Sequence, residues 1–339
     1  NYYANGDEGA NGIPDILDEA KWGLDWLVKM NPDSNTYFNQ LADDRDHIGF
    51  TLPNEQKVDY GWGAGKQRPV YFVSPKPQGL QKYKNRSTGM ASTLGKYTSS
   101  FSLGAKVLSK YYPEFSEMLL RKAKDAYRKG VANPGVSQTA PGGAPYFYEE
   151  DNWADDMQLA AAEMYSTFGQ KEYLTQAINY GRLEPVTPWM GADSARHYQW
   201  YPFVNLGNYH LVVQNNDLRA QKEFIRNMKT GLQRVKDRAG DSAFMNGIPF
   251  IWCSNNLTVG FITQCRLYHE ITGDDSYVEI ETAMRDWLFG CNPWGTSMIV
   301  GYPEHGDTPV DPHSAFTHLH QMPITGGIVD GPIYNSIFS

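Results

Sequence analysis

Residue types that could do chemistry gather first in residues 146–156, which read YFYEEDNWADD. Five carboxylate side chains fall within eight of these positions. Aromatic residues lie beside and among them, including Tyr146, Tyr148 and Trp153. Carboxylates accept hydrogen bonds from hydroxyl groups, and flat aromatic faces stack on sugar rings. The mixture is therefore typical of a cleft that holds a sugar chain.

The same acids also have a structural explanation. Asp151 or Asn152 is suited to cap a helix that starts here, and Asp155 and Asp156 would then occupy its first turn. Negative side chains are favoured at that end by the helix dipole. The sequence leaves both explanations open, together with a third: Asp155 or Asp156 as the catalytic carboxylate of a lyase or an epimerase.

A second group of candidates is the histidine-rich segment of residues 290–332, which is also dense in glycine and proline. It holds four of the eight histidines: His305, His313, His318 and His320. Zinc sites need three or four ligands at set spacings, and neither a cysteine pair nor two histidines four positions apart on a helix is present here, so we expect no metal. We expect a wrapped loop whose histidines hydrogen-bond a neutral polar ligand.

Other candidates are weaker. Trp200 and Trp252 each stand beside polar residues at an expected helix start, where they would be either sugar platforms or core. The acidic stretch DDRDH of residues 43–47 suits a structural calcium ion, although unspaced acids in a loop are more often only solvated. No other cofactor is expected. The three cysteines are interpreted as buried free thiols: Cys253, Cys265 and Cys291.

The elements that must position these residues are helices. Apolar residues recur at helical spacing, and no run alternates as a strand would. Nine helices are predicted, over residues 13–30, 87–112, 113–133, 152–168, 171–183, 201–213, 218–239, 254–272 and 276–292. A faint repeat joins two pairs of them, with Gly169 and Tyr173 in one copy and Gly273 and Tyr277 in the other.

Long segments without helical periodicity separate these helices, and they hold most of the tryptophan, proline and histidine. Solenoid repeats have short, even loops, so the pattern favours an all-α toroid whose elaborated loops carry the function. Four loops are expected on one face: residues 133–152, 184–201, 239–252 and 292–329.

The composition limits the partners. The chain has 339 residues, 41% of them hydrophobic, and a net charge of −8 with no basic block. Nucleic acid and anionic membrane surfaces are therefore not expected to bind. No apolar run approaches the roughly 20 residues of a membrane-spanning helix. We expect a monomer.

Several motifs, in order along the chain, resemble those of glycoside hydrolase family 9, the inverting endo-β-1,4-glucanases. NGIPDILDEAKWGLDWLVKM resembles the family's D-x-L-D-E-x-x-W-x-x-x-W-L helix, and EEDNWADDMQLAAAEMYSTFGQKEYL is similar to a hairpin that begins D-D-L/M-x-x-A-A. FGCNPWGTSMIVGYPE resembles G-x-N-P-x-x-x-S-Y-V-x-G-x-G, and PITGGIVDGP resembles L-x-G-G-L-V-G-G-P. The segment of residues 68–89 looks most like xyloglucan-active members from gut bacteria.

This resemblance implies an (α/α)6 barrel of twelve helices, with a glycan lying in a cleft across one end. Residues 1–339 would be the central portion of that catalytic domain, incomplete at both ends. The implied activity is hydrolysis of β-1,4-glucosidic bonds in cellulose, xyloglucan or mixed-linkage glucan with inversion of configuration. A secreted, periplasmic or cell-surface bacterial enzyme is the implied setting.

The resemblance also nominates an active-site histidine. The family motif P-H-H-R maps onto Pro312 to Ala315, which keeps His313 and replaces the arginine by alanine, so that His318 or His320 would substitute for the lost cation. We expect His313 to hydrogen-bond a hydroxyl of the sugar beside the scissile bond, with Asp311 fixing its tautomer.

Inverting hydrolysis needs a carboxylic acid and a carboxylate base about 6.5–9.5 Å apart. The family motifs that carry them, D-A-[GS]-D and N-E followed by a distant alanine, do not occur in these 339 residues. We therefore expect both groups outside this chain; the alternative is a catalytically dead barrel that only binds glycan. The residues expected to contact the glycan are Tyr146, Tyr148, Trp153, Asp155, Asp156, Trp200, Trp252 and His318.

Overall fold

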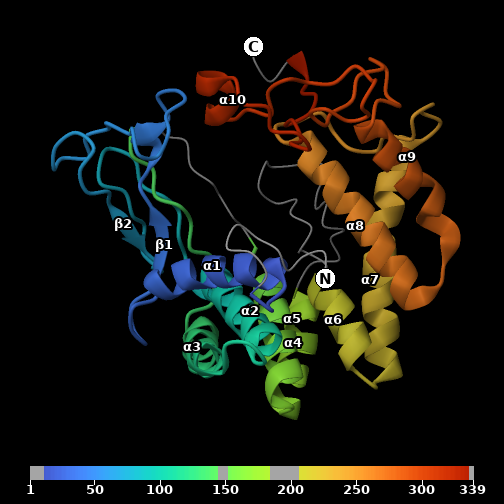
Figure 1. Ribbon diagram of the computed structural model, residues 1–339. Coiled ribbons are helices and arrows are strands. Elements are labelled where there is room, and N and C mark those ends of the chain that lie inside the picture. Colours follow the sequence, from blue (N-terminus) through green and yellow to red (C-terminus); the bar gives the residue numbers. More distant parts are fainter. Residues whose placement is uncertain (1–10, 144–151, 184–205, 336–339) are drawn as a thin grey trace. The chain divides into compact units, whose positions relative to one another are not determined.

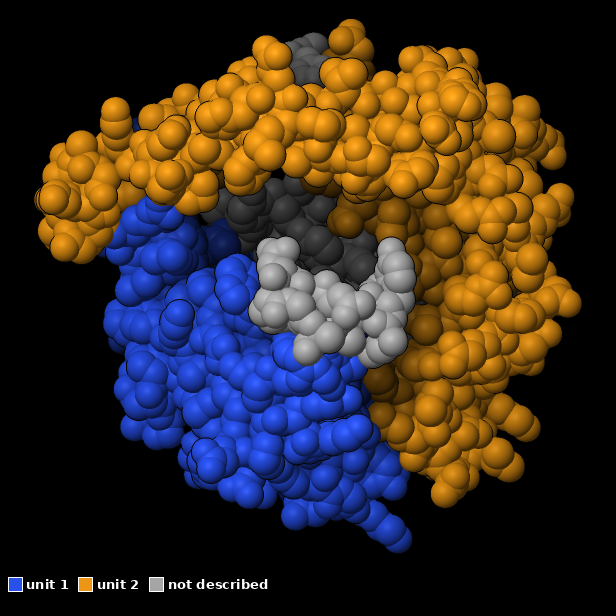
Figure 2. Space-filling view, viewed as in Figure 1, with its two compact units in different colours: residues 1–45, 68–184 blue, residues 46–67, 185–339 orange. Residues whose placement is uncertain are grey.

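The computed structural model describes residues 11–143, 152–183 and 206–335, and these are mainly helical. The chain divides into two units, each considered by itself (Figure 2). Unit 1 comprises Asn1–Arg45 and Arg68–Glu184, and unit 2 comprises Asp46–Gln67 and Pro185–Ser339. The predicted all-α class is confirmed, since the described strands form only one small hairpin.

Unit 1 is built around helix α2 (Ala91–Leu108), which packs against helices on several sides (Figure 1). Its other elements are α1 (Asp15–Lys29), β1 (Phe38–Leu41), β2 (Val70–Phe72), α3 (Pro113–Ala132), α4 (Ala154–Phe168) and α5 (Lys171–Leu183). A short 3-10 helix, η1 (Asp44–Asp46), stands where the two units meet in the sequence.

Small residues let α2 approach its neighbours closely. A Cβ atom placed on Gly95 would lie 2.8 Å from Cβ of Asp156 on α4. One on Gly104 would lie 2.5 Å from a methyl group of Leu24 on α1. Larger residues at either position would push the helices apart, and this explains the glycine and serine content of α2.

Unit 2 holds the remaining helices: α6 (Leu206–Gln214), α7 (Leu218–Ala239), α8 (Ser254–Thr272), η3 (Asp275–Tyr277), α9 (Val278–Leu288) and α10 (Ala315–His320). Helices α7, α8 and α9 bury a shared apolar core made of Leu232, Val235, Leu257, Phe261, Cys265, Ile280, Met284 and Trp287. Asp217 starts α7, because its carboxylate accepts hydrogen bonds from the N–H groups of Arg219 and Ala220.

All nine predicted helices are present, and α7 and α8 begin and end at the predicted residues. The 3-10 helix η1 was not predicted. Nor were α10 and the antiparallel pair β1–β2, in which Phe38 faces Phe72 and Leu41 faces Val70. Both are too short to show a period. Strand β1 has four residues and α10 has six.

The predicted repeat is confirmed at both turns. Gly169 and Gly273 end α4 and α8 in the left-handed conformation, at φ 71° and 68°. Each of their N–H groups donates to a carbonyl oxygen four residues earlier, at 2.8 and 2.7 Å. Tyr173 and Tyr277 then pack edge-on against Tyr127 and Tyr268.

Cys253, Cys265 and Cys291 are free thiols, as predicted. Only Cys265 is buried, however, whereas Cys253 is half-buried and Cys291 is exposed. The interpretation of all three as buried was therefore wrong for two. Cys291 follows the end of α9, where the chain leaves the core. Among the described helices, none has the length and apolar character of a membrane span.

Candidate functional site

The histidine-rich loop of unit 2 is tied down where it leaves α9. The amide of Asn292, which is 5% exposed, donates to the carbonyl oxygens of Trp287 at 3.0 Å and Thr296 at 2.7 Å. The N–H of Met298 then donates to the carbonyl of Leu288. These bonds fix the start of the loop against the core, so this part of the loop is ordered by the protein itself.

The far end of the loop is strapped to the start of α8. The N–H of Asn255 donates to the carbonyl of Asp330 at 3.0 Å, and its side-chain amide donates to the carbonyl of Val329 at 2.9 Å. Gly331 has φ 99°, and a Cβ atom there would lie 2.5 Å from Oγ of Ser254. Only glycine allows this approach.

His313 has a left-handed backbone, with φ 63°. This conformation costs a non-glycine residue about 1–2 kcal/mol. The turn is held by Asp311, whose carboxylate accepts from the N–H of Ser314 at 2.9 Å. Ser314 in turn caps α10 by accepting from the N–H of Phe316. The surrounding bonds thus stabilise a strained turn that carries an exposed imidazole, a pattern that clusters at functional sites.

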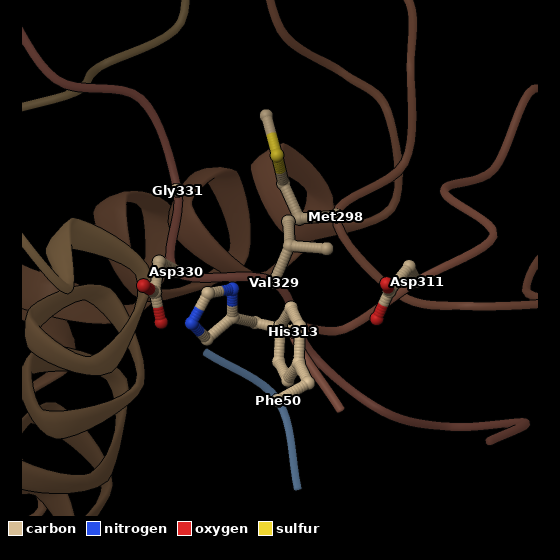
Figure 3. Close-up of a pocket in the computed structure, with 7 residues that line it drawn as sticks. All are labelled: Phe50, Met298, Asp311, His313, Val329, Asp330 and Gly331. Atoms are coloured by element: carbon tan, nitrogen blue, oxygen red, sulfur yellow. The ribbon is translucent and has the colours of Figure 1, made fainter. Parts of the chain in front are cut away.

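A cavity of about 350 Å³ opens beside this turn (Figure 3). Its lining combines apolar and polar side chains with one glycine: Phe50, Met298, Asp311, His313, Val329, Asp330 and Gly331. The volume lies at the low end of the range for small-molecule sites. A lining of three apolar side chains, two carboxylates and one imidazole suits a neutral ligand that carries hydroxyl groups.

Phe50 joins the cavity from a distant part of the sequence. Its ring meets the ring of His313 edge-on, with 4.9 Å between centroids, and lies tilted against His318 at 4.4 Å. One aromatic side chain therefore contacts both histidines, although His318 itself does not line the cavity.

Comparison with known proteins decides the family. The sequence model of glycosyl hydrolase family 9 matches residues 1–339. The chain belongs to glycosyl hydrolase family 9.

Curated relatives of this family 9 chain share its sequence at a low level. A cellulose 1,4-β-cellobiosidase of Acetivibrio thermocellus is 24% identical, covering 95% of this chain and 37% of the relative. Endoglucanase C of Cellulomonas fimi is 23% identical over 88% of this chain and 25% of its own length. A xyloglucan-specific endo-β-1,4-glucanase of Bacteroides ovatus is 24% identical over 96% and 53%. The chain spans about a quarter to a half of these relatives.

A solved structure shows the fold of this family 9 chain. A metagenome-derived family 9 endoglucanase superposes with a TM-score of 0.72 at 23% identity, covering 98% of this chain and 56% of that one. The fold is therefore the (α/α)6 barrel of family 9 endoglucanases, as the resemblance implied.

Asp311 was expected to fix the tautomer of the His313 ring. Its carboxylate accepts from the backbone of Ser314, and no hydrogen bond between described residues joins it to the ring of His313. Figure 3 shows the imidazole of His313 directed toward Asp330, with Asp311 on the other side. Asp311 thus shapes the turn that carries the histidine.

The acidic start of α4 is explained mainly by structure. Asp156 is 8% exposed, and its carboxylate lies 2.7 Å from the ammonium of Lys96 on α2. Asn152 accepts from the N–H of Ala154, but the N-cap position is Trp153, which makes no side-chain cap bond, so Asn152 is not the cap that the sequence suggested. Asp155 is half-buried in the first turn, where the helix dipole favours it.

The aromatic candidates divide between the two units. Trp153 is half-buried and packs edge-on against Tyr180 in unit 1, whereas Trp252 is 43% exposed in unit 2. Tyr146, Tyr148 and Trp200 lie outside the described residues. A shared sugar platform, and one common face for the long loops, stay predictions.

The acidic stretch of residues 43–47 is engaged by protein donors. The carboxylate of Asp43 accepts two bonds from Arg45 and one from the hydroxyl of Tyr71. Burial raises the pKa of Asp43, but these bonds outweigh it and hold the pKa below its usual value. No group of three or more metal-ligating side chains occurs among the described residues. Structural calcium stays a prediction, without a nominated ligand set.

Among the residues that line the cavity, sequence reasoning gave a role only to Asp311 and His313. Two of those it missed are instructive. Phe50 lies in a segment that carries no periodic or motif signal, and only the fold brings it to His313. Asp330 did have a signal, because it stands where the quoted family motif L-x-G-G-L-V-G-G-P has a glycine.

Proposed function

We propose that the protein hydrolyses β-1,4-glucosidic bonds in a cellulose-like glucan with inversion of configuration. The observation that carries the proposal is the family match along all 339 residues. Relatives named for action on cellulose or xyloglucan support this substrate class. The hydroxyl-compatible cavity at His313 supports it independently of any relative.

The proposed role of His313 is to hold a sugar hydroxyl beside the scissile bond. Both proton transfers of inverting hydrolysis belong to carboxyl groups, so an imidazole nearby is left with positioning. The strained turn at Asp311 to Ser314 fixes the backbone before substrate arrives. Binding energy can then be used for contacts that strengthen in the transition state.

The acid and the base are proposed to come from sequence outside these 339 residues. Within the chain, the buried carboxylate of Asp156 is paired with Lys96, and that of Asp311 is hydrogen-bonded in the turn. An ion pair favours the charged carboxylate and so disfavours its use as a proton donor. Neither residue is therefore proposed as the general acid.

A polymeric glucan cannot cross a membrane, so we place the enzyme outside the cytoplasm, as a secreted, periplasmic or cell-surface protein. Xyloglucan stands beside cellulose and mixed-linkage glucan as a proposed substrate. Binding of glycan without hydrolysis is the alternative function, and the endoglucanase relatives do not favour it.

The test is product analysis with the full gene product on cellulose, xyloglucan and mixed-linkage glucan. Proton NMR during the first turnovers should show the α-anomer before mutarotation. A β-anomer formed first would contradict inversion. Glucan binding with no reducing ends released would favour the binding-only alternative.

A further inference from the structure

Asp330 is the cavity residue to which neither the family motif nor the mechanism above gives a role. It lines the same cavity as His313, and its side chain is exposed. Burial and then the charge of Asp330 raise the pKa of the Cys253 thiol, and Cys253 is the residue before α8. The carboxylate therefore lies at the start of α8, on the cavity side (Figure 3).

The backbone around Asp330 is fixed by several hydrogen bonds, although the Asp330 side chain is exposed. Its carbonyl accepts from Asn255, the preceding carbonyl accepts from the amide of Asn255, and the hydroxyl of Ser254 donates to the carbonyl of Pro332 at 2.8 Å. The close approach of Gly331 to Ser254 leaves this strap little freedom. A side chain carried on such a strap is pre-organised.

His313 and Asp330 face the same space without contacting each other. Among the described residues, no hydrogen bond or ion pair joins the two side chains, although both line the cavity. An imidazole and a carboxylate that face the same space can hold one hydroxyl group between them. It accepts from the ring N–H through its oxygen and donates its own hydrogen to the carboxylate.

The charge of the lining points to the same kind of ligand. Besides His313 the cavity presents two carboxylates, from Asp311 and Asp330, and no lysine or arginine. Ala315 stands where the family motif has an arginine, so the cation of that motif is absent at that position. Such a lining favours a neutral sugar over one that carries a carboxylate.

We propose that Asp330 and His313 together clamp one hydroxyl of a neutral glucosyl unit, which makes Asp330 a substrate-orienting residue. The proposal rests on the proposed function for its ligand class. The clamp uses both ends of one O–H group, so losing either partner removes most of what the other contributes. A carboxylate that only stabilised the start of α8 through the helix dipole would show no such dependence.

The test is a double-mutant cycle in the full gene product, with kcat/KM measured on cellotetraose. Asp330→Ala should lower kcat/KM by about 10- to 100-fold, the scale of one charge-assisted hydrogen bond. In a His313→Ala background, the same substitution should change it by less than about threefold. Asp330→Asn keeps the shape and an acceptor, and should fall between wild type and Asp330→Ala.

Glu279→Ala is the matched control, because Glu279 is an exposed carboxylate in the first turn of α9 and does not line the cavity. It should leave kcat/KM unchanged. Melting temperatures of all variants separate a folding defect from a binding defect.

Two results would overturn the clamp. One is an Asp330→Ala variant, or Asp330→Asn if the alanine variant does not fold, with kcat/KM within twofold of wild type. The other is a double variant whose loss in kcat/KM equals the product of the two single-variant losses. If wild type binds cellotetraose without cleaving it, the proposed function fails, and the same cycle measured on Kd still decides the clamp.

Discussion

The acidic start of α4 in unit 1 and the histidine loop of unit 2 both attract attention in the sequence, yet they are built differently. At α4 the buried Asp156 has a lysine within 2.7 Å, and the backbone is ordinary helix. In the loop, His313 is exposed on a strained backbone that its neighbours hold in place. A cluster of charged residues is therefore weak evidence for a functional site. A strained backbone that its neighbours stabilise around an exposed side chain is stronger evidence.

The largest effect should come from the loop. His313→Ala should lower kcat of the full gene product on a polymeric glucan by roughly 10- to 1000-fold, or about 1.4 to 4 kcal/mol. The exposed side chain supports no core packing, so the melting temperature should hardly move. A His313→Ala variant with wild-type kcat would contradict a functional role for the strained turn at His313.

Asp156→Ala should behave in the opposite way. Removing the buried carboxylate breaks its ion pair with Lys96, and unit 1 should lose about 1–2 kcal/mol of unfolding free energy. Urea denaturation measures this loss, with Glu172→Ala on the exposed face of α5 as the control. A folded Asp156→Ala enzyme whose kcat had collapsed would instead support the catalytic carboxylate considered from the sequence.

The same contrast explains what sequence could and could not predict. Helices α7 and α8 were placed at their observed ends because long apolar periods stop at Gly240 and Gly273. Helix α10 is a single short turn among glycines and prolines, so it has no period to detect. Composition nominated four histidines in this segment, and only the family motif singled out His313 among them.

The rest of the cavity depends on contacts between distant parts of the chain. The contact of Phe50 with His313 joins residues that are far apart in sequence, and nothing local to either predicts it. The hydrogen bond from the N–H of Ser314 to Asp311 was not predicted, because spacing cannot tell a side-chain partner from a backbone N–H three residues away.

A smaller effect is expected at Phe50. Phe50→Ala removes the ring that contacts both His313 and His318, so the imidazole loses part of its orientation. We expect kcat to fall by about 3- to 10-fold, the scale of one aromatic contact, with KM changing less. Phe50→Tyr keeps the ring and should restore most of the rate. Equal losses in both variants would argue against a packing role.

The smallest effect should come from the exposed tryptophan of unit 2. Trp252 is 43% exposed, so we expect the exposed part of its indole to contact a sugar ring. Trp252→Ala should weaken binding of a soluble glucan by about 1 kcal/mol, near fivefold in Kd by isothermal titration calorimetry. Trp294, which is 53% exposed but packs on Phe250 and Trp287, is the control, because its replacement by alanine should lower stability more than glucan affinity. Binding unchanged by Trp252→Ala would restrict the sugar contacts of unit 2 to the cavity at His313.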